Sequence, residues 1–249
     1  MIFRKNKRRF TLSHLLLLVA VVAAVLLLIA GPGTRLDWWD FRFGFVLMRW
    51  AVYFALAGVV IGGLLLLVKS TRRGPTAVLV TALAVSLATA AIPLSLLQQA
   101  RSLPRIHDIT TDVVEVPAFV AVVPLRADAP NPVEHAGGEV ITQQQSAYPD
   151  IKTYETNAPA EQVFAAALAV AEDLGWQVVD QSPAEGRIEG YHTTFWFGFV
   201  DDVVIRIRPV NGSTHVDMRS KSRVGLSDVG KNAARIRQFM DALDQRLGD

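Results

Sequence analysis

The chain has 249 residues, of which 51% are hydrophobic, and its formal net charge at pH 7 is +2. Charge is unevenly distributed: residues 1–100 contain 11 Lys and Arg against 2 Asp and Glu, whereas residues 101–249 contain 14 against 21. Because the basic residues accompany the apolar segments, the basic isoelectric point does not indicate nucleic-acid binding. The chain contains no cysteine, which excludes disulfides, thiolate catalysis and cysteine-ligated metals.

Three apolar runs, at residues 12–30, 43–68 and 76–97, are each long enough for a helix that crosses the hydrocarbon layer. The basic segment before the first run is also typical of a signal peptide. However, Leu28 stands where cleavage after Ala30 requires a small residue. We therefore expect a retained anchor and a transmembrane region of three helices within residues 1–100.

The distribution of Lys and Arg predicts the orientation of these helices. Basic residues precede the first run at positions 4–9 and fill the loop between the second and third runs at positions 69–73. Such residues mark the cytoplasmic side of a membrane. The pattern predicts a bacterial inner-membrane protein with a cytoplasmic amino terminus and a periplasmic carboxyl-terminal domain.

Polar and small residues within the runs indicate packing rather than a binding site. Arg49 lies near the predicted outer interface, where its side chain can reach the headgroups. Gly58 and Gly62 form a GxxxG motif, and the third run carries a ladder of small residues, which allow close helix contact: Ala82, Ser86 and Ala90. No run carries paired carboxylates, so a transporter or channel is not expected.

Residues 101–150 form a predicted connector, because six of the 12 prolines lie between positions 104 and 149. We expect an extended segment packed on or near the domain, with short helical turns near 117–122 and 142–147. His107 and Asp108 lie near its start, but the histidines lack the spacing of a metal site. The aspartates and threonines there are expected to cap turns, and no metal or cofactor is predicted.

Residues 151–249 show the periodicity of a folded domain. A strand is predicted at 151–156, a helix from Pro159 to Gly175, and strands at 176–181 and 187–194. The final segment, 228–247, has one narrow apolar stripe typical of a helix that faces a core. This order predicts an α+β domain with a mainly antiparallel sheet and two helices on one face. It also looks like a helix-grip module, by analogy of fold alone.

Residues 203–222 alternate in polarity on both sides of Asn211-Gly212, the favoured centre of a two-residue hairpin turn. Counting outward from the turn fixes the register. It places Arg206 opposite Asp217 and Asp202 opposite Lys221. Opposite charges at such positions predict two ion pairs across the strands.

Two motifs suggest chemistry that the surrounding sequence does not support. Residues 225–232, "GLSDVGKN", nearly match a phosphate-binding loop, but Asn232 replaces the hydroxyl that contacts magnesium. We expect a helix start capped by Ser227 or Asp228 and no nucleotide binding. Asp201 and Asp202 could act as paired carboxylates, but neighbouring strand residues point to opposite faces. No enzymatic activity is predicted.

Two sets of residues remain as candidate contacts. Arg219, Lys221 and Arg223 project from one strand face and Lys231 begins the next helix, so an anion or a partner can bind there. The second set is the aromatic segment: Phe195, Trp196, Phe197 and Phe199. Either its three phenylalanines close the domain core under a helix, or the segment is an exposed apolar tip with Trp196 outermost.

Three blocks carry a resemblance to a known family: "IHDITTD", "TTFWFGFVDDVVIRI" and "DMRSKSRVGLSDVGKNAARIRQFMDAL". Together they resemble a bacterial family known as domain of unknown function 1499, and the resemblance spans residues 106–247. It implies membrane segments ahead of the domain. It supplies no agreed activity, cofactor or catalytic residue to transfer.

These observations predict a non-enzymatic, membrane-anchored envelope protein. Its outer domain is expected to bind a protein partner, to form a homo-oligomer or to support assembly of a complex. The alternative is a binding module for a lipid or another amphipathic or anionic ligand held between sheet and helix. A cavity lined by Phe197, Phe199 and the final helix would favour the alternative, whereas a filled core with an exposed patch around Trp196 would favour the first function.

Overall fold

The computed structural model describes residues 11–68 and 76–248. These residues form two compact units. The first comprises the described residues up to Gln98 together with Trp196–Gly198, and the second comprises Gln99–Phe195 and the residues from Phe199 onward. The basic residues at positions 4–9 and 69–73, on which the predicted orientation depends, lie outside the described residues.

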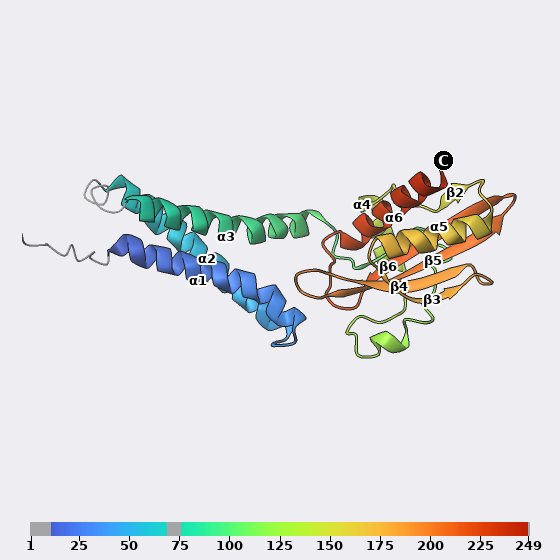
Figure 1. Cartoon of the computed structure of the whole chain (residues 1–249), viewed down its shortest axis with the longest axis horizontal. Coiled ribbons are helices and arrows are strands. Elements are labelled where there is room, and N and C mark those ends of the chain that lie inside the picture. Colours follow the sequence, from blue (N-terminus) through green and yellow to red (C-terminus); the bar gives the residue numbers. More distant parts are fainter. Residues whose placement is uncertain (1–10, 69–75, 249) are drawn as a thin grey trace, which may run out of the picture. The chain divides into compact units, whose positions relative to one another are not determined.

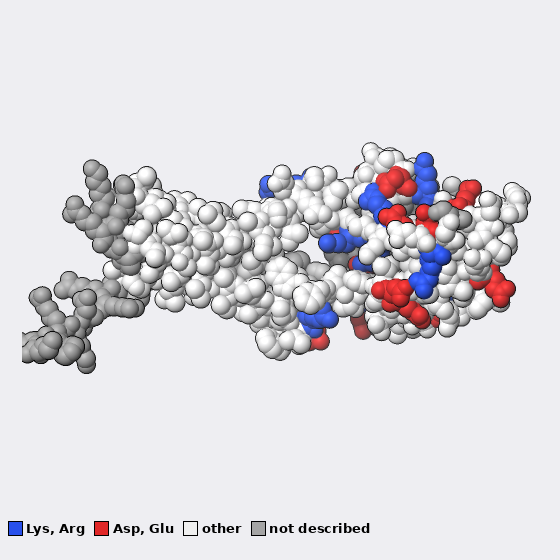
Figure 2. All heavy atoms as spheres, turned by 45° about the horizontal axis from the view of Figure 1, so that its top comes forward, with Lys and Arg blue, Asp and Glu red and all other residues white. Residues whose placement is uncertain are grey.

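The first unit contains the helices α1 (Leu12–Arg35), α2 (Phe41–Leu67) and α3 (Thr76–Ser102). All three are long and apolar enough to cross a membrane, which confirms three apolar helices at the positions of the predicted spans. α1 and α3 extend about five residues beyond their apolar runs, because helical hydrogen bonding continues into the polar flanks. In the view of Figure 2 the surface of these helices is almost free of charged side chains, and Arg49 is exposed on α2.

Small residues allow the three helices to pack closely. A Cβ atom on Gly58 would lie 2.5 Å from the hydroxyl oxygen of Ser86, and one on Gly62 would lie 2.7 Å from Leu83. Ala23, Ala55 and Ala90, one from each helix, form a buried cluster. The GxxxG motif and the small-residue ladder therefore pack the helices on one another, as predicted.

The second unit is built on a six-stranded antiparallel sheet (Figure 1). Its strands are β1 (Asp108–Thr110), β2 (Tyr154–Thr156), β3 (Gln177–Ser182), β4 (Arg187–Thr193), β5 (Val200–Val210) and β6 (Ser213–Ser222). The strand order is β1-β6-β5-β4-β3, and β2 also pairs with β6. The prediction of an α+β domain with an antiparallel sheet is confirmed.

The helices α5 (Ala160–Asp173) and α6 (Lys231–Leu247) lie side by side over one face of this sheet (Figure 1). Between them and the sheet is one continuous apolar core. The Trp176 ring stacks on that of Phe239 with centroids 5.4 Å apart, and Phe239, Ile205 and Met218 are fully buried. The described residues thus fill the space between sheet and helices with side chains.

The hairpin has the register predicted from Asn211-Gly212. Arg206 lies opposite Asp217 and Asp202 lies opposite Lys221. Asn211 has a φ of 49° and Gly212 a φ of 92°, as this turn requires. The alternation of side chains sends Ile205 and Ile207 toward the helices and Asp202 and Arg206 toward the opposite face.

The connector is more structured than its proline content suggests. It supplies β1, a 3-10 turn η2 (Pro124–Arg126) and the helix α4 (Gly138–Ala147). The prediction missed β1, placed the first helical turn at 117–122 instead of 124–126, and gave only the second half of α4. β1 depends on partners far along the chain: its backbone pairs with β6, and Thr110 exchanges two hydrogen bonds with the side-chain amide of Gln144 (3.0 and 2.7 Å).

The aromatic segment between β4 and β5 does not close the domain core. Phe195 is 89% exposed, so for this residue the alternative of an exposed tip holds. Trp196 and Phe199 are half-buried, and Phe195 rather than Trp196 is the outermost member. Phe197 is buried within the first unit, where its ring centroid lies 5.2 Å from that of Phe45.

Candidate functional site

Charged side chains are concentrated between the sheet and the connector. β1 places Asp108 beside β6, opposite Lys221. The Asp108 carboxylate accepts hydrogen bonds from Nε and Nη2 of Arg219 (2.9 and 2.8 Å) and from Nζ of Lys221 (2.7 Å). All three side chains are buried. A buried carboxylate thus holds two buried cations in charge-assisted hydrogen bonds.

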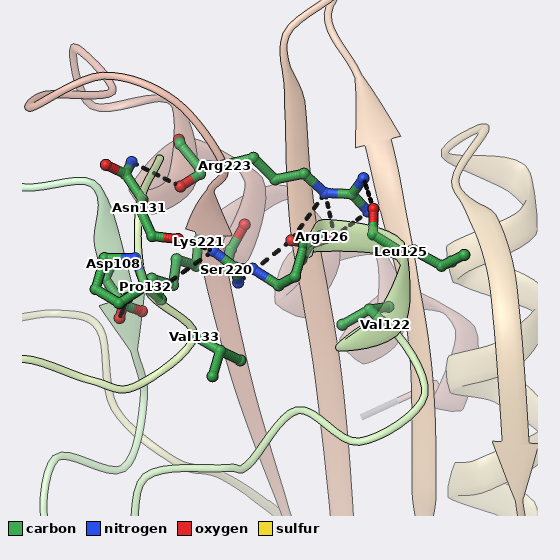
Figure 3. Close-up of polar contacts among 12 residues, drawn as sticks. Asp108, Val122, Leu125, Arg126, Asn131, Pro132, Val133, Ser220, Lys221 and Arg223 are labelled. Atoms are coloured by element: carbon green, nitrogen blue, oxygen red, sulfur yellow. Dashed lines mark hydrogen bonds and ion pairs between the residues drawn. The ribbon is translucent and has the colours of Figure 1, made fainter. Parts of the chain in front are cut away.

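A second buried carboxylate, that of Asp202, lies opposite Lys221 on the neighbouring strand β5. It pairs with Arg126 and Arg223, whose positions Figure 3 shows. Asp202 accepts hydrogen bonds from Nε and Nη2 of Arg223, at 2.7–3.1 Å. Nη1 of Arg126, from η2, lies 3.3 Å from the other side of the same carboxylate. Together with the Asp108 group, these residues form what we call the charge cluster: Asp108, Arg126, Asp202, Arg219, Lys221 and Arg223.

Backbone carbonyl groups of the connector complete the charge cluster. Arg219 donates to the carbonyl oxygens of Pro117 and Val133 (3.3 and 2.9 Å), and Lys221 donates to that of Glu134 (2.7 Å). Arg223 likewise donates to the carbonyl of Leu125 (2.7 Å). The connector is therefore fixed to the sheet by cations that bind its main chain.

Burial and pairing oppose each other in setting the protonation of this cluster. Burial pushes the pKa of Asp108 upward, but the hydrogen bonds and charges of Arg219 and Lys221 outweigh it, so the pKa lies below its usual value. Burial lowers the pKa of Lys221, against the attraction of Asp108. The low pKa of Asp108 keeps it ionised, which suits a structural ion pair rather than a general base.

Glu189 anchors another part of the connector. This fully buried side chain on β4 accepts hydrogen bonds from the backbone N–H groups of Val120 (3.0 Å) and Val122 (3.1 Å) and pairs with Arg187. Phe119 and Val122 pack on Val204 beside it. The loop before η2 is therefore held by both ionic and apolar contacts.

The helix face of the sheet carries a separate polar network. Asp201 accepts a hydrogen bond from Arg235 of α6 (2.6 Å), whose Nη2 also lies 3.3 Å from Nδ1 of His192. Arg235 donates further to Ser220 and Asn232. The neighbouring carboxylates of Asp201 and Asp202 thus face opposite sides of the sheet, as predicted, and do not share a site.

In the loop that resembles a phosphate-binding motif, residues 225–232, a side chain of the loop itself binds the backbone N–H groups at the start of α6. The carboxylate of Asp228 accepts hydrogen bonds from the backbone N–H groups of Gly230 and Asn232 (2.8 and 2.7 Å). These are the groups that would bind a phosphate at the start of α6. The expected cap is confirmed for Asp228, and its charge opposes an anion at this helix end.

Two predictions about the strand cations need correction. One face of β6 does carry Arg219, Lys221 and Arg223, but the connector covers this face. The three cations therefore do not form an open anion-binding surface. Of the four predicted residues, only Lys231 is exposed. Lys221 also pairs with Asp108 instead of with Asp202. The Arg206–Asp217 pair is confirmed at 2.8 Å.

The sequence analysis missed Asp108 and Arg126 as partners of the sheet, and Glu189 of β4 as a partner of the connector. A usable signal was present: three cations on one face of a predicted core strand need nearby carboxylates, and the connector supplies Asp108. Among the residues that the structure describes, no group of three or more His, Asp or Glu could hold a metal ion.

Comparison with known proteins identifies a family for this chain. A family model described as "Protein of unknown function (DUF1499)" matches residues 108–243. The match covers more than half of the chain and begins at Asp108, so it includes the connector as well as the sheet and helices. It confirms the resemblance carried by the three sequence blocks. The chain matches no curated protein.

Proposed function

The chain belongs to the family described as protein of unknown function DUF1499, and from that premise we propose that it is a membrane-anchored, non-enzymatic protein of the bacterial envelope whose domain binds a protein partner. The proposed location is the inner membrane, with the domain in the periplasm. The charge distribution around the apolar runs supports this orientation.

One observation carries the proposal: a rigidly held loop presents apolar side chains to solvent. Val120, Val123 and Leu125 are 56%, 38% and 50% exposed, although Phe119, Val122 and Arg126 in the same loop are buried. We call these three residues the connector patch. Exposed apolar groups that lie close together favour contact with another macromolecule.

The loop that carries the connector patch is fixed to the sheet, which supports a role of the patch in binding a partner. Glu189 holds the N–H groups of Val120 and Val122, and Arg126 ties the other end of the loop to Asp202. Since the backbone is already ordered, a partner loses little binding free energy to ordering it. Binding residues are commonly found on loops positioned by a rigid scaffold.

The internal role of the carboxylates supports a non-enzymatic function. Asp108, Asp202 and Glu189 are almost fully buried, and each accepts hydrogen bonds from Arg or Lys. A general acid or base must reach a substrate within hydrogen-bonding distance. These side chains instead hold the connector in place.

The filled core favours a protein partner over a lipid held between sheet and helices. Phe239 and Leu243 of α6 are fully buried against the sheet, where such a ligand would lie. Phe197, one of the residues proposed to line the cavity, is buried in the first unit instead.

Photocrosslinking in intact cells tests the proposal. A photoreactive amino acid at Val123 is expected to form a specific protein adduct, whereas the same group at Val114 is not. Val114 is a matched control because it lies in the connector, is a valine and is 88% exposed. Changing Val120 and Leu125 to Asp should remove the adduct without changing hydrogen exchange in the domain.

An adduct with twice the mass of the chain would identify a second copy as the partner. Equal adducts at Val114 and Val123, or an adduct that survives the two Asp substitutions, would contradict binding at the connector patch.

A further inference from the structure

Two exposed apolar side chains lie at one end of the domain sheet. Phe195, in the turn between β4 and β5, is 89% exposed, and Leu226, in the loop between β6 and α6, is 69% exposed. The two segments adjoin, because the N–H of Arg223 donates to the carbonyl of Val200 (3.0 Å). Phe195 and Leu226 therefore mark the same end of the sheet, and we call them the apolar tip.

The same end receives the chain as it leaves α3. Within the second unit, Nε2 of Gln99 donates to the carbonyl of Val229 (3.2 Å), and the N–H of Asp228 donates to the carbonyl of Ile106 (3.1 Å). Leu103 also lies against Gly230, where an added Cβ would be 2.9 Å from its Cδ1. The loop of Leu226 is thus tied to residues 99–106.

The sequence of α3 gives the depth of this loop. About 20 apolar residues cross the hydrocarbon layer, and the apolar run of α3 ends just before Gln98, Gln99 and Arg101. Gln99 is therefore expected among the lipid headgroups. A loop bonded directly to Gln99 lies at about the same depth, and an exposed leucine on it can reach the acyl boundary.

The charges around the tip suit a lipid surface. Arg101, Arg105 and Lys231 are exposed near these contacts, whereas the carboxylate of Asp228 is turned inward onto Gly230 and Asn232. Basic residues close to a bilayer are attracted by anionic headgroups.

We propose that the apolar tip inserts into the headgroup–acyl boundary of the bilayer that holds the chain's own helices, with Arg101, Arg105 and Lys231 over anionic headgroups. The occupant is a lipid surface because the loop is bonded to the residues that emerge from a membrane helix. This contact would fix the end of the sheet at the membrane. It depends on the membrane anchor but not on the partner of the connector patch.

The absence of native cysteine allows a site-specific test with the full chain. Leu226→Cys and Phe195→Cys are each labelled with an environment-sensitive fluorophore in lipid nanodiscs that contain phosphatidylglycerol and phosphatidylcholine. Val114→Cys is the matched control. It is at least about as exposed as the two tip residues, and it lies beside Asp112, which pairs with Arg206. At about 3.3 Å per residue, Arg206 is about 20 Å along β5 from Val200, so this control lies far from the apolar tip.

The labels at 226 and 195 are expected to emit at shorter wavelength than the label at 114. Spin-labelled lipids should quench them several-fold more strongly, and aqueous iodide should quench them less. Equal quenching at all three positions in pure-lipid nanodiscs would overturn the proposal. Shielding at 226 that occurs only in native membranes would also overturn it, because it would assign the tip to a protein. If either outcome occurred and the adduct at Val123 still formed in cells, the apolar tip would be excluded as a membrane contact while the proposed function would still stand.

Discussion

The two faces of the domain sheet are held by different forces. On the helix face, Val203, Ile205 and Ile207 pack into the apolar core under α5 and α6. On the connector face, the charge cluster binds carboxylates and main-chain carbonyls through directional hydrogen bonds. The first face requires hydrophobic groups of suitable size, whereas the second requires particular partners at particular positions.

The connector face also shows how a proline-rich segment can close a sheet. The charge cluster contains four cations and only two carboxylates, Asp108 and Asp202. The carbonyls of Pro117, Val133, Glu134 and Leu125 supply the additional acceptors. A segment with many prolines forms few strand ladders, so its carbonyls remain available to Arg and Lys.

The largest effect is expected from Asp108→Asn. This change leaves Arg219 and Lys221 buried without their carboxylate, and loss of one partner of a buried ion pair costs about 3–5 kcal/mol. Hydrogen exchange of the full chain in detergent micelles should show this loss first in residues 108–133. Asp128→Asn, an exposed acid in the same connector, should change the free energy of opening by less than about 0.5 kcal/mol. Equal effects would mean that the charge cluster does not hold the connector.

A core substitution tests the opposite face. Leu243 of α6 is fully buried, and Leu243→Ala is expected to cost about 2–5 kcal/mol through lost burial and the cavity left behind. Because the core joins both helices to the sheet, exchange should increase throughout the domain rather than in the connector first. An increase confined to α6 would show that the helix face is less cooperative than the filled core implies.

The sequence predicted the helix face better than the connector face, for a physical reason. The hairpin register follows from a two-residue turn, and the core positions follow from alternation, so both depend on neighbours along the chain. The partner of Lys221 is Asp108, at a separation of 113 residues, and β1 has only three residues. Neither leaves a periodic signal. The same limit applies to Phe195, whose exposure depends on how the turn between β4 and β5 closes.

Acid should affect His192 on the helix face and Asp108 on the connector face in different pH ranges. Burial and the charge of Arg235 lower the pKa of His192 on the helix face, so as pH falls below about 6.5 the unfolded chain takes up this proton before the folded chain does. Stability therefore decreases in that range, and His192→Gln should reduce the decrease.

The pKa of Asp108 is also lowered, by Arg219 and Lys221 against the effect of burial. Its contribution to stability is fully present above about pH 3.9 and is lost as pH falls through the lower pKa of the folded state. Thermal melting as a function of pH should thus show a first decrease that His192→Gln reduces and a second, below about pH 3.9, that Asp108→Asn reduces. A single decrease unaffected by either substitution would contradict the roles assigned to His192 and Asp108.

The smallest effect is expected at the edge of the connector face, where Arg208 contacts two acids of different burial. Its contact with Glu115 is short, at 2.6 Å, but the Glu115 side chain is 66% exposed; its contact with Asp217 is longer, at 3.3 Å, and Asp217 is fully buried. Exposed ion pairs contribute about 0–1 kcal/mol and are screened by salt. Glu115→Gln should therefore have almost no effect on hydrogen exchange.

Asp217→Asn should cost much more, since this carboxylate also accepts hydrogen bonds from Arg206, Thr111 and Thr153 and its loss leaves buried groups unpaired. If Glu115→Gln proved the more damaging of the two, distance rather than burial would determine which ion pairs hold the connector. The stabilisation attributed to the charge cluster would then need another explanation.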